Sequence, residues 1–193
     1  EGENAAENAK AFERRCRPPI TENRRRQLAE VFVRNKRKVF FMKIVVDAMG
    51  GDNAPQEIVK GAAMALSKDK DLKVVLTGDE QKINKTLAGL TYDKARLEVI
   101  NCTEVITNDD TPTLAIRQKK DSSLVVALKL LKEDEKVQGF VSAGSTGAVL
   151  TGALLRVGRI RGISRPAVCP MLPTATGGRV LIIDAGANAE CKP

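Results

Sequence analysis

Short apolar runs alternate with helix-like patterns along residues 43–184. Apolar runs of this kind are typical of buried strands, and we expect strands at residues 43–47, 73–77, 96–101, 139–142, 167–171 and 180–184. Apolar residues at i, i+3, i+4 and i+7 form one face of a helix. Three such stripes occur: Val59, Ala62, Ala63 and Leu66; Leu124, Ala127, Leu128 and Leu131; and Leu150, Ala153, Leu154 and Val157. The alternation predicts βα units, and therefore an α/β fold with a mostly parallel sheet.

The first 41 residues differ from the rest in charge. They hold 11 Lys and Arg against 6 Asp and Glu, so they carry +5 of the net charge of +8. Such a segment is typical of a solvated arm or of a nucleic-acid-binding tail. Because the character of the chain changes at Met42, we interpret residues 1–41 as a flexible basic extension and Met42 as the natural start. Residues 42–193 form the globular part, and we expect this part to be a fragment because it ends directly after a strand and a glycine turn.

Two features of the composition restrict the chemistry. The sequence contains no histidine, which excludes imidazole acid–base catalysis, Ser-His-Asp triads and histidine metal sites within the chain. The four cysteines show no CxxC spacing, so neither a zinc site nor a redox pair is indicated: they are Cys16, Cys102, Cys169 and Cys191. We expect no metal and no cofactor. Free thiols and the absence of an apolar run of about 18–20 residues predict a cytoplasmic protein without a membrane span or secretory signal.

A glycine-containing segment joins the first expected strand to the first expected helix. Asp47 ends the strand, and Gly50, Gly51 and Asp52 follow it. Paired glycines allow backbone conformations that other residues avoid, and Asp52 can cap the helix. Open α/β sheets bind ligands at the carboxyl ends of strands, so this loop is either part of a site or only a turn and a cap. We assign these four residues as loop organisers.

A second loop of small residues follows the strand at 139–142. Backbone N–H groups at a helix N-terminus, together with hydroxyl groups, can cradle an anion. The candidate residues are Ser142, Gly144, Ser145, Thr146 and Gly147. The loop lacks the Lys-Ser/Thr ending of a Walker A motif, and the chain contains no GxGxxG, so nucleotide binding is not indicated.

Three further groups of polar residues are candidates for binding negative charge or for catalysis. Arg117, Lys119 and Lys120 could bind phosphate oxygens or form a solvated basic turn. A second basic cluster could receive an acidic partner protein or be plain surface: Arg156, Arg159, Arg161 and Arg165. Asp184 and Asn188 follow the last expected strand, where they could orient a donor and stabilise an oxyanion or simply form a turn.

Four segments in this order resemble one bacterial family, the phosphate acyltransferases of phospholipid synthesis. They are Met42-Lys-Ile-Val-Val-Asp-Ala-Met-Gly-Gly-Asp-Asn-Ala-Pro55, Ala115-Ile-Arg-Gln-Lys-Lys-Asp-Ser-Ser123, Ser142-Ala-Gly-Ser-Thr-Gly-Ala148 and Asp184-Ala-Gly-Ala-Asn-Ala-Glu-Cys-Lys-Pro193. The resemblance covers residues 42–193 and leaves residues 1–41 outside it.

The resemblance implies a three-layer α/β/α fold, similar to that of isocitrate dehydrogenase and phosphotransacetylase, and a homodimer. It also implies that inorganic phosphate attacks the thioester of an acyl-acyl-carrier protein. The acyl phosphate then serves the membrane glycerol-3-phosphate acyltransferase, and the protein associates peripherally with the inner face of the membrane. Because phosphate is itself the nucleophile, the missing histidine is no obstacle to this reaction.

On this basis we expect phosphate to bind the loop at 142–147 together with Arg117, Lys119 and Lys120. Asn188, Lys192 and Asp184 are the candidate catalytic residues near the thioester carbonyl, and the basic cluster at Arg156–Arg165 is the candidate surface for the carrier protein. For the acyltransferase that we favour, we expect no nucleic-acid partner. Two alternatives remain open: a phosphotransacetylase-like enzyme that uses short acyl-coenzyme A, and a nucleic-acid-binding protein that acts through its basic arm.

Overall fold

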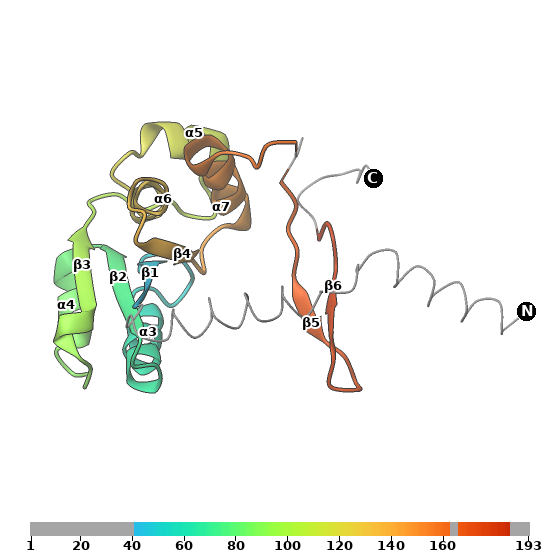
Figure 1. Ribbon diagram of the computed structural model, residues 1–193. Helices are drawn as coiled ribbons and strands as arrows, with labels where there is room; N and C mark the ends of the chain where they lie inside the picture. The colour runs from blue at the N-terminus through green and yellow to red at the C-terminus, as the bar shows by residue number, and fades with distance from the viewer. Residues whose placement is uncertain (1–40, 163–165, 186–193) are drawn as a thin grey trace, which may run out of the picture. The chain divides into compact units, whose positions relative to one another are not determined.

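The computed structural model describes residues 41–162 and 166–185 (Figure 1). Four strands alternate with helices over most of this range. The strands are β1 (Met42–Asp47), β2 (Leu72–Gly78), β3 (Leu97–Asn101) and β4 (Val137–Val141). The helices between and after them are α3 (Gln56–Lys68), α4 (Glu80–Leu87), α5 (Pro112–Gln118), α6 (Ser123–Glu133) and α7 (Thr146–Gly152), and a π-helical turn at Ala153–Val157 extends α7.

These strands form one parallel sheet in the order β3-β2-β1-β4. The register pairs Val45 of β1 with Val75 of β2 on one side and with Phe140 of β4 on the other. The chain first moves outward from β1 to β3, and then crosses to the opposite side of β1 to form β4. The order of the strands therefore reverses between β1 and β4.

Alternate residues of the central strands face two separate cores. Val46, Val74 and Leu76 pack against the buried stripe of α3 and against Ile83 and Leu87 of α4. Val45 and Val75 face the other way and pack against Ala127 of α6, while α5 and α7 pack on the far side of α6. Helices thus cover both faces of a parallel sheet, which confirms the predicted α/β fold with three layers.

A small antiparallel pair replaces the last two expected strands. Residues 167–171 and 180–184 were expected in the parallel sheet, whereas the structure has a hairpin of β5 (Met171–Pro173) and β6 (Arg179–Leu181). The prediction failed because the run from Thr174 to Gly178 forms a tight turn. Thr174 N–H donates to the Gly178 carbonyl at 3.0 Å, and Gly177 has a φ of 81°.

Two of the three expected helical stripes are confirmed. Val59, Ala62, Ala63 and Leu66 are all buried on α3, and the stripe that begins at Leu124 forms the buried face of α6. The third stripe is wrong in detail, because Leu154 is 39% exposed. The helix becomes a π-helix at Ala153, which rotates the later residues, and its buried positions are the small residues Ala148 and Gly152.

Candidate functional site

The two loops of small residues follow neighbouring strands at the point where the strand order reverses. The segment at residues 47–52, which we call the glycine loop, follows β1, and the segment at residues 142–147, which we call the anion loop, follows β4. Strands β1 and β4 are hydrogen-bonded and parallel, so both loops leave the same edge of the sheet. Open α/β sheets bind their ligands in the crevice at such a switch point.

A hydrogen bond joins these two loops, and further hydrogen bonds form within each loop. The Ser142 hydroxyl donates to Asp47 Oδ2 at 2.9 Å, although 95 positions separate the two residues in sequence. The Gly144 N–H donates to Ser142 Oγ at 3.1 Å, and the Met49 N–H donates to Asp47 Oδ1 at 3.2 Å. Asp47 is 3% exposed, so this carboxylate holds both loops from a buried position.

Close backbone packing explains the glycines of both loops. A Cβ atom on Gly50 would lie 2.7 Å from Asp47 Oδ2, 2.8 Å from Ser142 Oγ and 2.9 Å from the Gly144 nitrogen. A Cβ on Gly144 would in turn lie 3.3 Å from the Gly50 Cα. Gly51 has a φ of 104°, which favours glycine. Only glycine fits at position 50, because any side chain there would displace the hydrogen-bonded groups.

The anion loop leads into the first turn of α7. Ser145 caps this helix, since its hydroxyl oxygen accepts from the Ala148 N–H at 3.4 Å. The N–H groups of Thr146 and Gly147 belong to the first turn, where a helix offers no internal acceptor. Within residues 41–162 and 166–185 no acceptor is found for these two groups, and the Thr146 side chain is exposed. The loop can therefore offer two amides and a hydroxyl to an anion.

The three basic residues of α5 and its following turn have different environments. A Cβ on Gly147 would lie 3.2 Å from Pro112 Cγ, so α5 and α7 begin side by side. Arg117 is exposed, and at 1.5 Å per residue it lies about 7.5 Å along α5 from Pro112. Lys119 donates to the Val105 carbonyl at 2.9 Å and to Asp110 at 2.6 Å, whereas Lys120 is exposed. The ammonium of Lys119 is thus bound by Val105 and Asp110, whereas Arg117 and Lys120 are exposed to solvent.

A family model described as "Fatty acid synthesis protein" matches residues 42–193, which include both loops. The chain belongs to this family. Proteins named phosphate acyltransferase are similar to it: one from Clostridium tetani is 55% identical over 152 residues and one from Alkaliphilus oremlandii is 56% identical over 152 residues. In both comparisons the alignment covers 79% of this chain, and it covers 45% and 44% of the respective relatives. The chain therefore spans about half the length of the curated relatives it matches.

Two solved structures share the fold of this family member. The EutD phosphotransacetylase from Staphylococcus aureus matches with a TM-score of 0.54 and 20% identity, over 82% of this chain and 50% of that protein. A phosphotransacetylase from Streptococcus pyogenes matches with a TM-score of 0.51 and 21% identity, over 79% and 50%. These likenesses confirm the expected relationship to the phosphotransacetylase fold.

Most of the remaining candidate residues of this family member lie apart from the two loops in sequence, and several lie outside the described residues. Arg156 donates to the Ile116 carbonyl at 2.7 Å, so its guanidinium holds the end of α5, while Arg159 and Arg161 are exposed. Asp184 Oδ1 accepts from the Val168 N–H at 3.0 Å at the base of the hairpin. Asp52 is exposed and makes no capping bond, since Pro55 precedes α3. Outside the described residues lie Arg165, Asn188 and Lys192.

Sequence reasoning missed a buried polar cluster beneath the loops. The Thr77 hydroxyl at the end of β2 lies 3.3 Å from the Val46 carbonyl oxygen and 3.0 Å from that of Ser123. Cys102 follows β3, and burial raises the pKa of its thiol to about 11, with the charges of Asp121 and Asp47 adding to the shift. The sequence signal was the placement of Thr77 and Cys102 at the ends of expected strands. The high pKa argues against Cys102 as a nucleophile at neutral pH.

The part of the chain that the structure describes contains no cluster of metal-ligating side chains and no helix that could span a membrane. No group of three or more Cys, Asp or Glu residues there could hold a metal ion. The helices of the same part are too short or too polar to cross a bilayer. These findings concern residues 41–162 and 166–185 alone.

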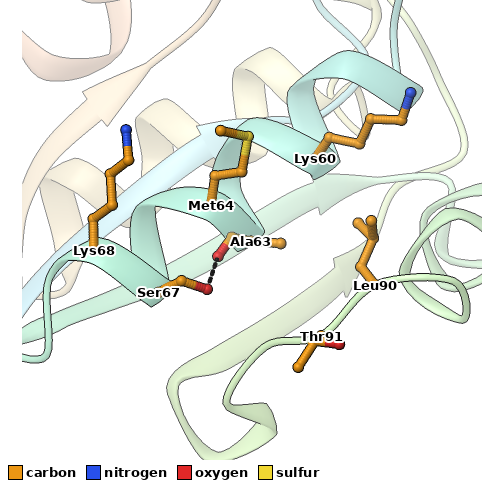
Figure 2. Close-up of a pocket in the computed structure, with 7 residues that line it drawn as sticks. All are labelled: Lys60, Ala63, Met64, Ser67, Lys68, Leu90 and Thr91. Atoms are coloured by element: carbon orange, nitrogen blue, oxygen red, sulfur yellow. Dashed lines mark hydrogen bonds between the residues drawn. The ribbon is translucent and has the colours of Figure 1, made fainter.

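A shallow cavity of about 400 Å³ lies elsewhere, between α3 and the loop before β3 (Figure 2). Its walls include Ala63, Met64 and Leu90, with Lys60 and Lys68 on the rim. The second half of α3 and the segment that enters β3 both lie toward the amino ends of the strands. The cavity is therefore remote from the edge where the two loops meet, and it contributes nothing to that site.

Proposed function

We propose that the chain is part of a phosphate acyltransferase, which moves a fatty acyl group from an acyl-carrier protein to inorganic phosphate. The observation that carries this proposal is the identity of 50–56% to proteins named phosphate acyltransferase, over the residues that build both loops. The position of these loops at the switch point of the sheet supports it, because that position suits an anion.

The proposed reaction needs no histidine. An oxygen of hydrogen phosphate forms a bond to the thioester carbonyl carbon, and the carbon–sulfur bond breaks. The proton of hydrogen phosphate ends on the carrier thiol, so the products are an acyl phosphate and a free thiol. The nucleophile brings its own negative charge, and the protein has to supply position and positive potential.

The anion loop is the proposed source of that positive potential. The N–H groups of Thr146 and Gly147 and the Thr146 hydroxyl would hold phosphate oxygens, with Arg117 or Lys120 as a mobile cation nearby. Correct positioning of phosphate against the carbonyl can lower the barrier by about 7–11 kcal/mol. A single well-placed donor to the developing oxyanion contributes about 3–4 kcal/mol. We propose Asn188 and Lys192 as the donors to that oxyanion, and Asp184 as the residue that orients them.

The partners follow from the same proposal. The product would be acyl phosphate for phospholipid synthesis, consumed by a glycerol-3-phosphate acyltransferase at the membrane. Exposed Arg159 and Arg161, together with Arg165, would attract the acidic carrier protein. We also propose a homodimer in the cytoplasm with peripheral association at the inner face of the membrane, and no cofactor.

Comparison of two acyl donors tests the proposal. Palmitoyl-carrier protein and acetyl-coenzyme A are each incubated with phosphate and the protein, and acyl phosphate is trapped with hydroxylamine. We expect phosphate-dependent hydroxamate from the carrier-linked donor. A preference for acetyl-coenzyme A would favour a phosphotransacetylase-like enzyme, which is the activity named for the two solved structures of the same fold. Absence of product from both donors, with a folded full-length enzyme that contains this chain, would reject acyl transfer to phosphate.

A further inference from the structure

The hydroxyl of Ser142 is already occupied on both sides. A serine hydroxyl has one proton to donate and two lone pairs to accept. The proton goes to Asp47 Oδ2 at 2.9 Å, and the oxygen accepts from the Gly144 N–H at 3.1 Å. Phosphate oxygens need donors, and Ser142 has no second proton to give. Its role in the anion loop therefore differs from that of Thr146.

We propose that Asp47 is a positioning residue for the anion loop, acting through Ser142 and Gly144. The buried carboxylate takes the Ser142 proton and thereby turns the Ser142 oxygen toward the Gly144 N–H. This contact fixes the turn that presents the amides of Thr146 and Gly147. Ser142 is accordingly part of the support and not a ligand of the anion. The inference deepens the proposed function, and it rests on that function for the identity of the anion.

The glycine loop shows that this geometry has little freedom. Asp47 is 3% exposed, and its other oxygen accepts from the Met49 N–H at 3.2 Å, so the carboxylate cannot turn without losing a bond. A Cβ on Gly50 would lie within 2.9 Å of Asp47 Oδ2, of Ser142 Oγ and of the Gly144 nitrogen. The backbone of Gly50 thus closes the space around all three groups and holds them together.

The substitution Asp47→Asn distinguishes a support from a ligand by the sign of its effect. In Asp47→Asn the amide oxygen can still accept one donor, but the NH2 group faces the second. The positioning role predicts that phosphate binds about ten- to a hundredfold more weakly, the usual effect of losing a hydrogen bond to a charged group. If Ser142 were a ligand, the same substitution would free its proton for phosphate and would leave binding unchanged or make it tighter.

The measurements are the KM for phosphate in the acyl transfer assay and the Kd for inorganic phosphate by calorimetry, both on the full chain. Ser142→Ala should raise both about as much as Asp47→Asn, and the double variant should be no worse than either. Ser142→Thr, which keeps a hydroxyl, should restore binding. Asp71→Asn and Ser67→Ala are matched controls, because both residues are exposed and remote from the loops.

Hydrogen exchange of the Gly144 amide gives a readout that does not depend on activity. We expect this amide to be protected in the wild type and in Ser142→Thr, and to exchange faster in Asp47→Asn. Additive effects of the two substitutions, or unchanged Gly144 protection in Asp47→Asn, would overturn the inference. Absence of acyl transfer activity in a full-length enzyme that contains this chain would reject the proposed function alone, provided that Gly144 still responds to Asp47→Asn.

Discussion

The guanidinium of Arg156 donates to the backbone carbonyl of Ile116 at 2.7 Å and so joins the end of the π-helical turn to the end of α5. Arg156 Nε is buried, and no partner for it is found among residues 41–162 and 166–185. The sequence places Arg156 in a basic cluster that could receive an acidic protein. The structure instead gives it an internal contact, so its neighbours Arg159 and Arg161 are the better candidates for a carrier surface.

Arg156→Ala should therefore reduce stability more than it affects binding of a carrier protein. Loss of a charged hydrogen bond to a buried carbonyl costs about 1.5–3 kcal/mol of the free energy of unfolding. Urea denaturation of the wild type and of Arg156→Ala measures this difference in the free energy of unfolding. Arg161→Ala is the matched control, and its exposed side chain predicts a change within about 0.5 kcal/mol. Equal stabilities of the two variants would contradict the internal role of Arg156.

Gly152 of α7 packs directly against α6 and α5. A Cβ there would lie 2.5 Å from Leu128 Cδ1 and 3.1 Å from Ile116 Cδ1, and both side chains are buried. Gly152→Ala should lower the free energy of unfolding by about 1–3 kcal/mol, the usual cost of overpacking a core. Thermal unfolding followed by circular dichroism measures the effect.

Gly61 offers the opposite case in the middle of α3. A Cβ at this position would have no heavy atom within 4 Å, and the residue is exposed. Since alanine favours a helix more than glycine does, Gly61→Ala should stabilise the protein by about 0.5–1 kcal/mol. If Gly152→Ala left the melting temperature unchanged or raised it, as Gly61→Ala should, the packing argument for Gly152 would be wrong.

The contrast between α3 and α7 explains how far the fold could be predicted from sequence. On α3, large apolar residues mark the buried face, and the stripe from Val59 to Leu66 is a true guide. On α7, the buried positions are Ala148 and Gly152, whose small size reveals nothing in a hydrophobic pattern. The hairpin has a related explanation, because apolar runs alone do not show that β5 and β6 pair with each other and not with the parallel sheet.

The candidate site shows the same division between local and long-range information. Glycines and hydroxyls at the ends of two strands predicted the two loops, because the carboxyl ends of parallel strands share an edge. No local pattern could show that β4 lies beside β1, and so none could show that Ser142 donates to Asp47. The ion pair between Lys119 and Asp110 was equally hidden, since a basic residue in a polar loop has many potential partners.

Burial of Cys102 makes the free energy of unfolding fall as pH rises in the alkaline range. Its folded pKa of about 11 exceeds the ordinary value of 9.0, so the folded state favours the protonated thiol. The resulting stabilisation is complete below pH 9 and is lost as pH rises toward 11, by about 2 kcal/mol over that window. The stability difference between the wild type and Cys102→Ala should therefore narrow from pH 9 to pH 11 in urea denaturation at each pH.

Thiol reactivity gives an independent check on Cys102. Cys169 is exposed, whereas Cys102 is buried. In single-cysteine variants that retain one of these residues, a thiol reagent at pH 8 should modify Cys169 within minutes and Cys102 only after denaturant is added. Rapid modification of Cys102 in the folded protein would contradict both its burial and its raised pKa.

The contact of Lys119 with Asp110 predicts which of two adjacent lysines is free to meet an anion. The hydrogen bond from Lys119 is the main cause that holds the pKa of Asp110 below its ordinary value, with the Thr107 N–H as a second donor. Stability from this contact is therefore present above the ordinary pKa of a carboxyl and is lost as pH falls through the lowered one. Lys119→Met should raise the pKa of Asp110 in an NMR titration of its carboxyl carbon.

Lys120→Met is the matched control for this substitution, because Lys120 is exposed and the adjacent Lys119 already occupies Asp110. It should leave the pKa of Asp110 unchanged and weaken phosphate binding, if the proposed mobile cation is Lys120. Lys119→Met should have the reverse pattern, since its ammonium is held by Asp110 and by the Val105 carbonyl. A weaker affinity for phosphate in Lys119→Met, with an unchanged pKa of Asp110, would show that Lys119 leaves this contact to bind the anion.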